Sequence, residues 1–400
     1  MSYLKSPPIH IIENDLDAIR AAHQVADFSL KGRNERDQNR RLPFAEIDLF
    51  SQTGLGGLRI PKQFSGAFVS NKTLAHVFRI LNKADSSVGQ IPQNQISLLY
   101  VIDLIANQEQ KKFIYTEILN GKRIANGGPE RHTKDTTTLA TTLHIENDRY
   151  FVNGEKFYST GSSFAHWLAI KALHPLGHVV LVLIPREAQG VNIIDNWNGF
   201  GQRTTSSGTV KLDQVEVDPF LIFDERKLTA QPTYRGAFSQ LLQVAIDVGI
   251  AEAALADTIT AVQKARPIID AQVEKASDEL YTLQEVGKSV VLLDAAILLL
   301  DEAAEYLDEL DQLDHISEQQ AAQASILVAQ AKVYANDAAL HISEKLLELG
   351  GSRSSLSSHN LDQHWRNARV HTLHDPIRWK LHALGNYFLN NTLPARHAWI

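Results

Sequence analysis

The sequence predicts an α+β multidomain protein whose three parts follow one another as helices, strands and helices. Apolar residues recur at helical spacing up to about residue 125, short strand-like runs rich in Val, Ile and Leu follow, and helical spacing returns from residue 239. A chain of 400 residues is also longer than one hydrophobic core usually serves. We therefore expect an N-terminal α-helical domain over 1–125, a central β-barrel-like domain over 126–230 and a C-terminal four-helix bundle over 231–400.

The first part contains four segments with the apolar spacing of helices. They are residues 14–28, 73–81, 95–105 and 109–119. The first begins at an Asn-Asp pair, a common helix start, and the last is followed by Asn120-Gly121, a common helix end.

The middle part shows the patterns of β-strands. Residues 139–145 alternate with a Thr-rich face, and further strands are expected over 167–172, 179–184 and 209–217. The dipeptide Asn153-Gly154 is flanked by aromatic and β-branched residues, a combination that favours a tight turn. We therefore predict a β-hairpin with its turn at Asn153-Gly154.

Long amphipathic helices dominate the last part, which follows a linker at 231–233. Ile342, Leu346 and Leu349 form one apolar face, and Gly350-Gly351 come directly after it. Because glycine is favoured just past a helix end, we expect this helix to stop there.

Composition and motifs exclude several classes of function. A formal net charge of −7 without a basic stripe argues against a nucleic-acid partner, and the absence of cysteine excludes disulfides, thiolate chemistry and Cys-zinc sites. No GxGxxG follows a strand and no Walker A motif is present, which argues against a Rossmann site. We expect a cytoplasmic protein without a signal peptide or membrane contact, because the most apolar run, 290–300, is interrupted by Asp294 and is far shorter than the roughly 20 residues that span a bilayer.

The densest group of chemically active side chains lies at 348–380, where four histidines and several arginines follow the Gly-Gly helix end. His371 and His374 are three residues apart, and Asp375 follows. Three interpretations remain open from these residues alone. They are a polar helix end, an acid–base pair with a fixed tautomer, and a metal site formed by both histidines and Asp375.

Two other groups could hold a ligand. Ser159 and Thr160 follow a predicted strand, and their hydroxyls could bond the edge of a planar heteroaromatic ligand while the Trp197 indole covers its face. Arg353 follows the Gly-Gly helix end, where open amides can approach an anion, and Arg266 precedes a proline. Each group also has a structural interpretation, because Ser-rich turns and surface arginines are common.

Three motifs carry a resemblance to a known family. They are GLGGLRIPKQFSG at 54–66, NGEKFYSTGSSFAHWLAI at 153–170 and WRNARVHTLHDP at 365–376. Together with the helix–strand–helix order, they resemble the acyl-CoA dehydrogenase superfamily. They resemble more closely its flavin-dependent monooxygenase branch, the dibenzothiophene monooxygenase and SfnB-like sulfur-acquisition oxidoreductase group. The resemblance covers nearly the whole chain and implies an acyl-CoA dehydrogenase-like fold.

The resemblance implies the monooxygenase of a two-component system that acts in sulfur acquisition. Reduced FMN, or alternatively FAD, would arrive from a separate flavin reductase and react with molecular oxygen. The resulting C4a-(hydro)peroxyflavin would oxygenate a small organosulfur substrate. The site residues that the resemblance implies are His374 as proton donor or acceptor, His371 as its assistant, Thr160, Ser159 and Trp197 at the flavin, and Arg266 and Arg353 at its phosphate across a subunit boundary of a homotetramer.

The resemblance also leaves alternatives. Acyl-CoA dehydrogenases use a glutamate base that often precedes Gly-Thr, whereas the matching position here is Asp375, followed by Pro376. An acyl-CoA dehydrogenase-like FAD oxidoreductase with Asp375 as base is one alternative, a metal-binding protein without flavin is another, and a binding or scaffold protein without chemistry is a third. Gln95 and Leu99 replace a His and a Tyr that dibenzothiophene-type enzymes present to the substrate, so the substrate stays open.

Overall fold

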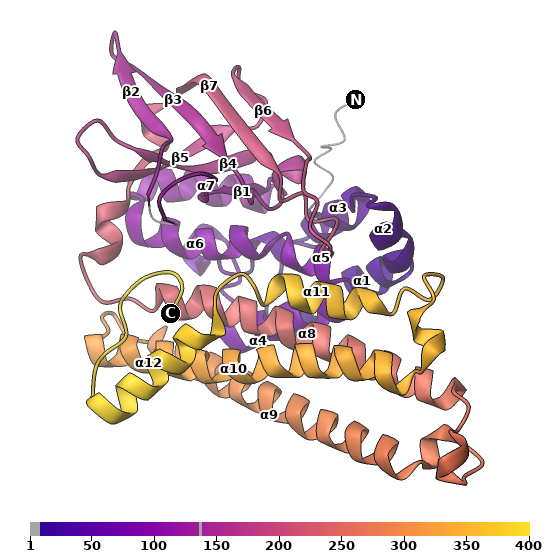
Figure 1. Ribbon diagram of the computed structural model, residues 1–400. Helices are drawn as coiled ribbons and strands as arrows, with labels where there is room; N and C mark the ends of the chain where they lie inside the picture. The colour runs from indigo at the N-terminus through magenta and orange to yellow at the C-terminus, as the bar shows by residue number, and fades with distance from the viewer. Residues whose placement is uncertain (1–8, 136–137) are drawn as a thin grey trace.

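The computed structural model describes residues 9–135 and 138–400, and Figure 1 shows a sheet at one end, long helices at the other and shorter helices between them. The helices of the first part are α1 (Asp15–Leu30), α2 (Arg33–Asn39), α3 (Phe44–Gln52), α4 (Asn71–Ala84), α5 (Ser86–Gln90), α6 (Gln93–Ile105) and α7 (Gln108–Leu119). The side chains of Asn14, Ser70 and Asn107 each accept a hydrogen bond from a backbone amide of the following first turn. The four helices predicted here are confirmed, with ends shifted by a few residues.

Eight strands of the described residues form one mixed sheet in the middle of the chain. They are β1 (Ile124–Gly127), β2 (Thr142–Glu146), β3 (Arg149–Lys156), β4 (Trp167–Leu173), β5 (Val179–Pro185), β6 (Val191–Ile194), β7 (Thr209–Val217) and β8 (Ile222–Asp224). Their order in the sheet is β6-β7-β3-β2-β4-β5-β8, with β1 pairing in parallel with β4. The strands predicted over 167–172, 179–184 and 209–217 are confirmed as β4, β5 and β7.

The hairpin predicted at Asn153-Gly154 is wrong. Both residues lie inside β3, one continuous strand, and the turn is instead at Asn147-Asp148, where both φ angles are positive, 50° and 60°. Gly154 lies where the register of β3 on β7 shifts, and a Cβ there would be 2.3 Å from Thr141 Oγ1. The glycine therefore admits a close neighbour at a bulge and does not turn the chain.

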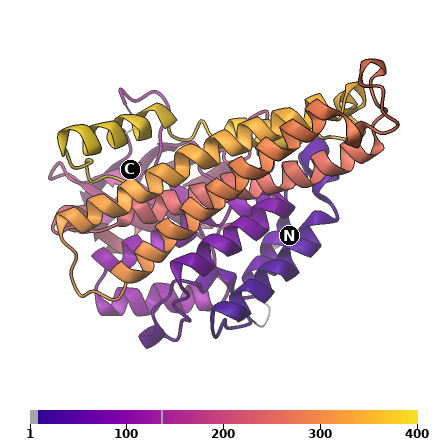
Figure 2. The same cartoon turned by 90° about the horizontal axis from the view of Figure 1, so that it is seen from below.

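The last part consists of α8 (Arg235–Lys264), α9 (Leu280–Leu310), α10 (Glu318–Leu349), α11 (Asp362–His371) and α12 (Ile377–Asn390). Figure 2 shows α8, α9 and α10 packed along one another. As predicted, α10 stops at Leu349, with Gly350 as its cap and Gly351 at φ 66°. Buried alanines line α10, and their small side chains let α8 approach closely.

Two hydrophobic cores organise these elements. One lies within the sheet, and the other joins the first helices to the last ones, with α4 packed against α8. The short helix α11 lies between the sheet end of the molecule and the long helices (Figure 1). Within the described residues, no helix is both long enough and apolar enough to cross a membrane.

Candidate active site

The turn that follows β3 gathers buried hydroxyls. Thr160 Oγ1 lies 2.8 Å from Ser207 Oγ, which lies 2.8 Å from Thr205 Oγ1. The Ser159 backbone donates to the Gly208 carbonyl at 3.3 Å, yet its fully buried Oγ has no hydrogen-bond partner within the described part of the chain. A buried hydroxyl without a partner costs free energy, so Ser159 marks a position suited to a polar ligand.

Helix α5 meets this turn from the other side. A Cβ on Gly161 would lie 3.5 Å from Ile91, which follows α5 directly, and Gln202 donates to the Ser86 carbonyl at 3.4 Å. Ser86 Oγ and Gln90 Oε1 are also buried and lack partners among the described residues. The turn after β3 and helix α5 therefore carry several buried side-chain oxygens that have no hydrogen-bond partner among the described residues.

Trp197 lies between β6 and β7, in a segment that rests on α11. Its Nε1 donates to the Gln202 carbonyl at 2.9 Å, and its ring centroid lies 6.1 Å from that of Tyr158 in an edge-on contact. The Gln202 amide in turn donates to Asn367 Oδ1 at 2.6 Å, and a Cβ on Gly201 would lie 2.0 Å from the Arg366 carbonyl. The indole and the hydroxyl turn are thus held against the helix that ends at His371.

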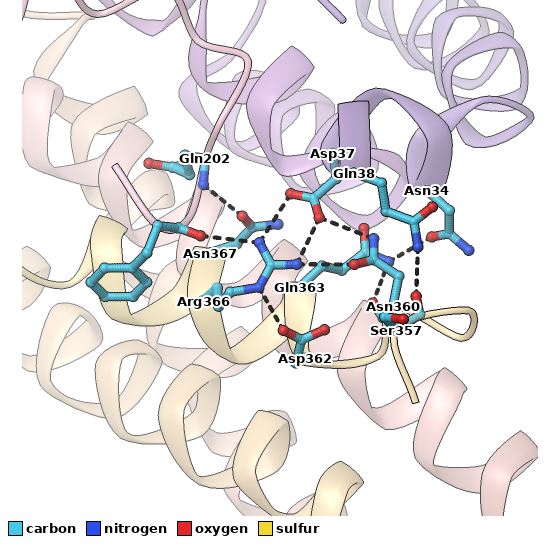
Figure 3. A network of polar contacts seen from close by, with 11 residues as sticks. Asn34, Asp37, Gln38, Gln202, Ser357, Asn360, Asp362, Gln363, Arg366 and Asn367 are labelled. Carbon is cyan, nitrogen blue, oxygen red and sulfur yellow. Dashed lines mark hydrogen bonds and ion pairs between the residues drawn. The ribbon is translucent and has the colours of Figure 1, made fainter. Parts of the chain in front are cut away.

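A network of polar contacts fixes α11 to both neighbouring parts of the molecule (Figure 3). Arg366 Nη2 lies 2.6 Å from Asp37 Oδ2 on α2, Nη1 donates to the Phe200 carbonyl at 3.0 Å, and Nε bonds Asp362 at 2.8 Å. The fork of guanidinium donors makes all three contacts at once. Further members of the network are Asn34, Gln38, Ser357, Asn360 and Gln363.

His371, at the end of α11, is 2% exposed and has both ring nitrogens engaged. Nδ1 lies 2.5 Å from Asp247 Oδ1 and Nε2 lies 2.6 Å from Gln243 Oε1, both on α8, while Lys332 Nζ lies 2.7 Å from Asp247 Oδ2. Burial lowers the pKa of His371 although Asp247 acts in the opposite direction. Burial would raise the pKa of Asp247, but His371 and Lys332 outweigh it and hold that pKa below its ordinary value. At neutral pH a neutral imidazole therefore lies beside a buried ion pair.

His374 is the histidine that a ligand can reach. Its side chain is 44% exposed and faces a cavity of about 570 Å³ that Trp379, His382 and Trp399 also line. Its ring centroid lies 6.4 Å from that of His371, with the ring planes 24° apart. The two rings lie side by side, as the spacing predicts, although α11 ends between them.

Asp375 is locked in a second buried ion pair. Lys380 Nζ lies 2.9 Å from its Oδ2, and both side chains are at most 5% exposed. Burial would raise the pKa of Asp375, but His374, Lys332 and Lys380 together hold it far below its ordinary value. The metal site considered from the sequence does not form, because His371 and Asp375 have other partners, and no three His, Asp or Glu side chains of the described residues could hold a metal ion.

Arg266 and Arg353 lie elsewhere. Both side chains are exposed, Arg266 in the segment that follows α8 and Arg353 in the segment that follows α10. The ends of these two helices are adjacent, because a Cβ on Gly350 would lie 3.4 Å from Ala261 Cβ. The ten-residue helix α11, about 15 Å long, separates this end of the bundle from His374. One chain therefore does not place these arginines beside His371 and His374, although Arg353 Nε lies 3.3 Å from Nε2 of another histidine, His359.

Gln95 and Leu99 are both buried on α6. Gln95 donates to the Gly56 carbonyl at 3.0 Å and accepts from the Ile124 amide at 3.0 Å, so it braces the fold and offers no free group to a ligand. Leu99 lines a separate cavity of about 460 Å³ beside Tyr100 and Arg59.

Sequence analysis missed Asp247, Gln243 and Lys332. The available signal was a single charge within an apolar helical run, AIDVGIA around Asp247 and AQAKVYA around Lys332. A charge at such a position is almost never buried unless it is paired.

Three family models cover most of the chain. They are the N-terminal, middle and C-terminal domains of acyl-CoA dehydrogenase, matching residues 15–122, 129–215 and 241–379.

Known proteins resemble the chain over almost its whole length. Dibenzothiophene monooxygenase of Mycolicibacterium goodii is 30% identical over 376 residues, covering 90% of each chain. A probable FMNH2-dependent monooxygenase of Pseudomonas putida, SfnC, is 28% identical over 384 residues, covering 94% of this chain and 96% of the relative. The crystal structure of FMN-bound TdsC from Paenibacillus sp. A11-2 superposes with a TM-score of 0.91 at 28% identity, covering 96% of this chain and all of TdsC.

Proposed function

Because this chain belongs to the acyl-CoA dehydrogenase family, we propose that it is a reduced-FMN-dependent monooxygenase of the branch that oxygenates organosulfur compounds. The names of its relatives support the cofactor and the class of substrate. The observation that carries the proposal is the contrast between two neighbours. His374 is 44% exposed in the cavity, whereas Asp375, which borders the same cavity, is only 5% exposed and is paired with Lys380.

The second half of this contrast weighs against the dehydrogenase alternative. A base that removes a substrate proton needs an accessible carboxylate with a pKa near the working pH. The Asp375 carboxylate is buried, its pKa is held far below the ordinary value, and its ion-pair partner lies 2.9 Å away. It is therefore a structural anion of the turn between α11 and α12.

The residues present fit a flavin. Ser159 Oγ is buried without a partner in the described chain, beside the hydroxyls of Thr160 and Ser207, which suits the polar edge of a flat ring system. Bound FMN in its reduced form supplies the activation of molecular oxygen. Ser159 and Thr160 would hold the edge of the ring system. Trp197, which lies in the segment that precedes β7, would shield the ring system from water.

In this proposal His374 donates and accepts the proton at the reacting end of the site. Imidazole is the side chain that most often transfers protons in enzymes, and the cavity gives His374 access to a ligand. His371 supports the ring of His374. It is not itself free to bond a ligand, because both of its ring nitrogens are already bonded. Trp379, Leu393 and Trp399 give the cavity apolar surface beside its histidines, which suits the carbon skeleton of a small sulfur compound.

The phosphate would be bound by Arg266 and Arg353 of a neighbouring subunit. Their distance from His374 along the bundle supports this arrangement, since one chain alone does not bring them together. Large apolar side chains on the outside of the long helices support a homotetramer, because such side chains are usually covered in an assembly. Those exposed on α9 and α12 include Leu280, Val291, Leu298, Trp379, Phe388 and Leu389. We further propose a cytoplasmic location with a separate flavin reductase as partner.

Anaerobic titration of the purified protein with oxidised and with reduced FMN tests the cofactor directly. We expect tighter binding of reduced FMN. Turnover is then assayed with a flavin reductase, oxygen and either dibenzothiophene or a small alkyl sulfide. Product containing one added oxygen atom supports the monooxygenase. Bleaching of bound flavin by an acyl-CoA without oxygen, and no sulfur oxygenation, would select the dehydrogenase instead.

A further inference from the structure

The buried group around His371 joins three helices through one ion pair and one imidazole. Asp247 comes from α8, Lys332 from α10 and His371 from α11, and each of these side chains is at most 1% exposed. Burying a lysine and an aspartate together is costly unless their geometry and remaining hydrogen bonds are good. Here both carboxylate oxygens of Asp247 are used, one by each partner. A buried ion pair in an otherwise alanine-rich bundle is costly, and we therefore look for a functional role for it.

The geometry points to that function: we propose that Asp247, held by Lys332, is the positioning residue that keeps a proton on Nδ1 of His371 and fixes this ring beneath His374. The inference rests on the proposed function, because it concerns how the proton-transferring histidine of that reaction is held. A carboxylate that accepts an imidazole N–H fixes both the tautomer and the ring orientation. With Nδ1–H directed to Asp247, Nε2 is left to accept from the Gln243 amide once that amide is oriented as a donor.

The position of the His371 ring affects His374 because the two rings are close together. The ring of His371 lies nearly parallel to that of His374, with 6.4 Å between centroids, and the turn between them continues into Asp375. The charged and titratable groups around this turn are Asp247 from α8, Lys332 from α10, Lys380 from α12, and His374 and Asp375 from the turn itself. His382 from α12 and His397 from the C-terminal segment line the same cavity. Removing the charge of Asp247 therefore changes the field at the turn as well as the support of the ring.

The chain contains a second His–Asp pair that serves as a control, although its carboxylate, Asp257, is 29% exposed and that of Asp247 is fully buried. His364 is one histidine earlier on the same helix α11 and is also buried, and its Nε2 lies 2.7 Å from Asp257 Oδ2 on the same helix α8. Arg33 supplies the cation, at 3.0 Å from Asp257. Both His–Asp pairs thus tie α11 to α8, but only the pair at His371 adjoins the cavity-facing histidine. A purely structural role predicts equal behaviour of the two pairs.

The test compares three forms of the full-length protein. The first is the wild type, and the second is the double variant Asp247→Asn/Lys332→Met, which removes both charges so that neither is left buried and unpaired. The third is Asp257→Asn. Proton NMR of protein with 15N-labelled histidine detects the strongly downfield imidazole N–H of a histidine bonded to a carboxylate. We expect the His371 signal to leave the strongly downfield region in the double variant, because an amide oxygen accepts the N–H more weakly than a carboxylate, and to stay there in Asp257→Asn, where the His364 signal changes instead. This readout does not depend on activity.

Steady-state kinetics with reduced FMN supply the second readout. We expect kcat of the double variant to fall about tenfold or more with an altered pH profile, while KM and FMN affinity change less than about twofold. Asp257→Asn should keep the wild-type pH profile. A double variant with the wild-type His371 signal, or with the wild-type kcat and pH profile, overturns the positioning role. If the signals behave as expected but no form oxygenates a sulfur compound, the proposed function fails and the positioning of His371 stands.

Discussion

Lys380 Nζ lies 2.9 Å from Asp375 Oδ2, and neither side chain of this buried ion pair is more than 5% exposed. Lys380 also donates to the Trp399 carbonyl, so one ammonium joins the turn, α12 and the C-terminal segment. The ion pair keeps the Asp375 carboxylate charged and engaged inside the protein. It also orients the turn that presents His374.

Replacing Lys380 with Met should destabilise the protein strongly. The substitution preserves the length of the side chain but leaves Asp375 charged and buried without its partner, which typically costs about 3–5 kcal/mol. Urea denaturation monitored by circular dichroism measures the loss. Lys288→Met is the control, because Lys288 pairs with Glu285 on the exposed surface of α9 and should lose less than about 1 kcal/mol. Equal losses in the two variants would contradict the burial argument.

His374→Ala should suppress oxygenation by about a hundredfold or more while FMN affinity changes little, because the side chain supplies a proton and does not hold the ring. Oxygen consumption and sulfur oxygenation are measured together, since wasted reduction of oxygen would persist. His382→Ala lines the same cavity on α12 and serves as the comparison. Unchanged product formation in His374→Ala removes that residue from the mechanism.

Ser159→Ala should weaken FMN binding by about tenfold, the value of one hydrogen bond to a ligand, without destabilising the protein alone. The reason is that Ser159 Oγ is buried and has no partner within the described residues, so its removal breaks no bond of the free protein. Ser343→Ala is the matched control, since Ser343 is equally buried on α10 but bonds the Ala339 carbonyl. Fluorescence titration with FMN and thermal denaturation give the two readouts. A Ser159→Ala protein that binds FMN normally would show that this hydroxyl does not contact the flavin.

Arg366→Met should loosen the contact between α11 and its neighbours. It leaves Asp37, which is 9% exposed, without its guanidinium and frees the segment at Phe200 (Figure 3). We expect a loss of about 2–3 kcal/mol in the free energy of unfolding, less than for a fully buried pair. The Trp197 emission should also shift, because the segment that carries Trp197 is bonded to α11. Arg226→Met, whose exposed pair with Asp224 is local, should change neither property.

Stability should decline below about pH 6.5, where free histidine titrates. Burial lowers the pKa of His166 to about 3 and also lowers the pKa values of His364 and His371. These histidines stay neutral in the folded protein while the unfolded chain binds protons, so falling pH favours unfolding. A further loss should begin near pH 4. The pKa values of Asp247 and Asp257 are held below the ordinary 3.8, and their stabilisation is lost as pH falls from there toward the folded values.

Urea denaturation at intervals from pH 8 to about pH 3 measures this profile. In His166→Asn the slope below pH 6.5 should be shallower, because one of the buried histidines is gone and the Asn oxygen can still accept the Arg123 amide. A stability that stays constant from pH 7 to pH 5 would contradict the assignment of these histidines as neutral.

Local sequence determined the elements whose signals are short-range. Apolar spacing and capping residues located the helices, β-branched runs located β4, β5 and β7, and Gly350 located the end of α10. The motif at 365–376 indicated the family and singled out His371 and His374. The Asn153-Gly154 signal failed because a glycine that turns a chain and a glycine that admits a neighbour look alike until the packing of Thr141 is known.

Tertiary structure decided which groups are free to react. His371 and His374 are equivalent in sequence, but only the fold engages the first with Asp247, 124 residues away, and leaves the second facing a cavity. Likewise Asp375 became a structural anion only when α12 brought Lys380 beside it. Residue type and spacing set which chemistry is available. Burial and distant partners set the protonation state, because they arise only from contacts between helices that are far apart in the chain.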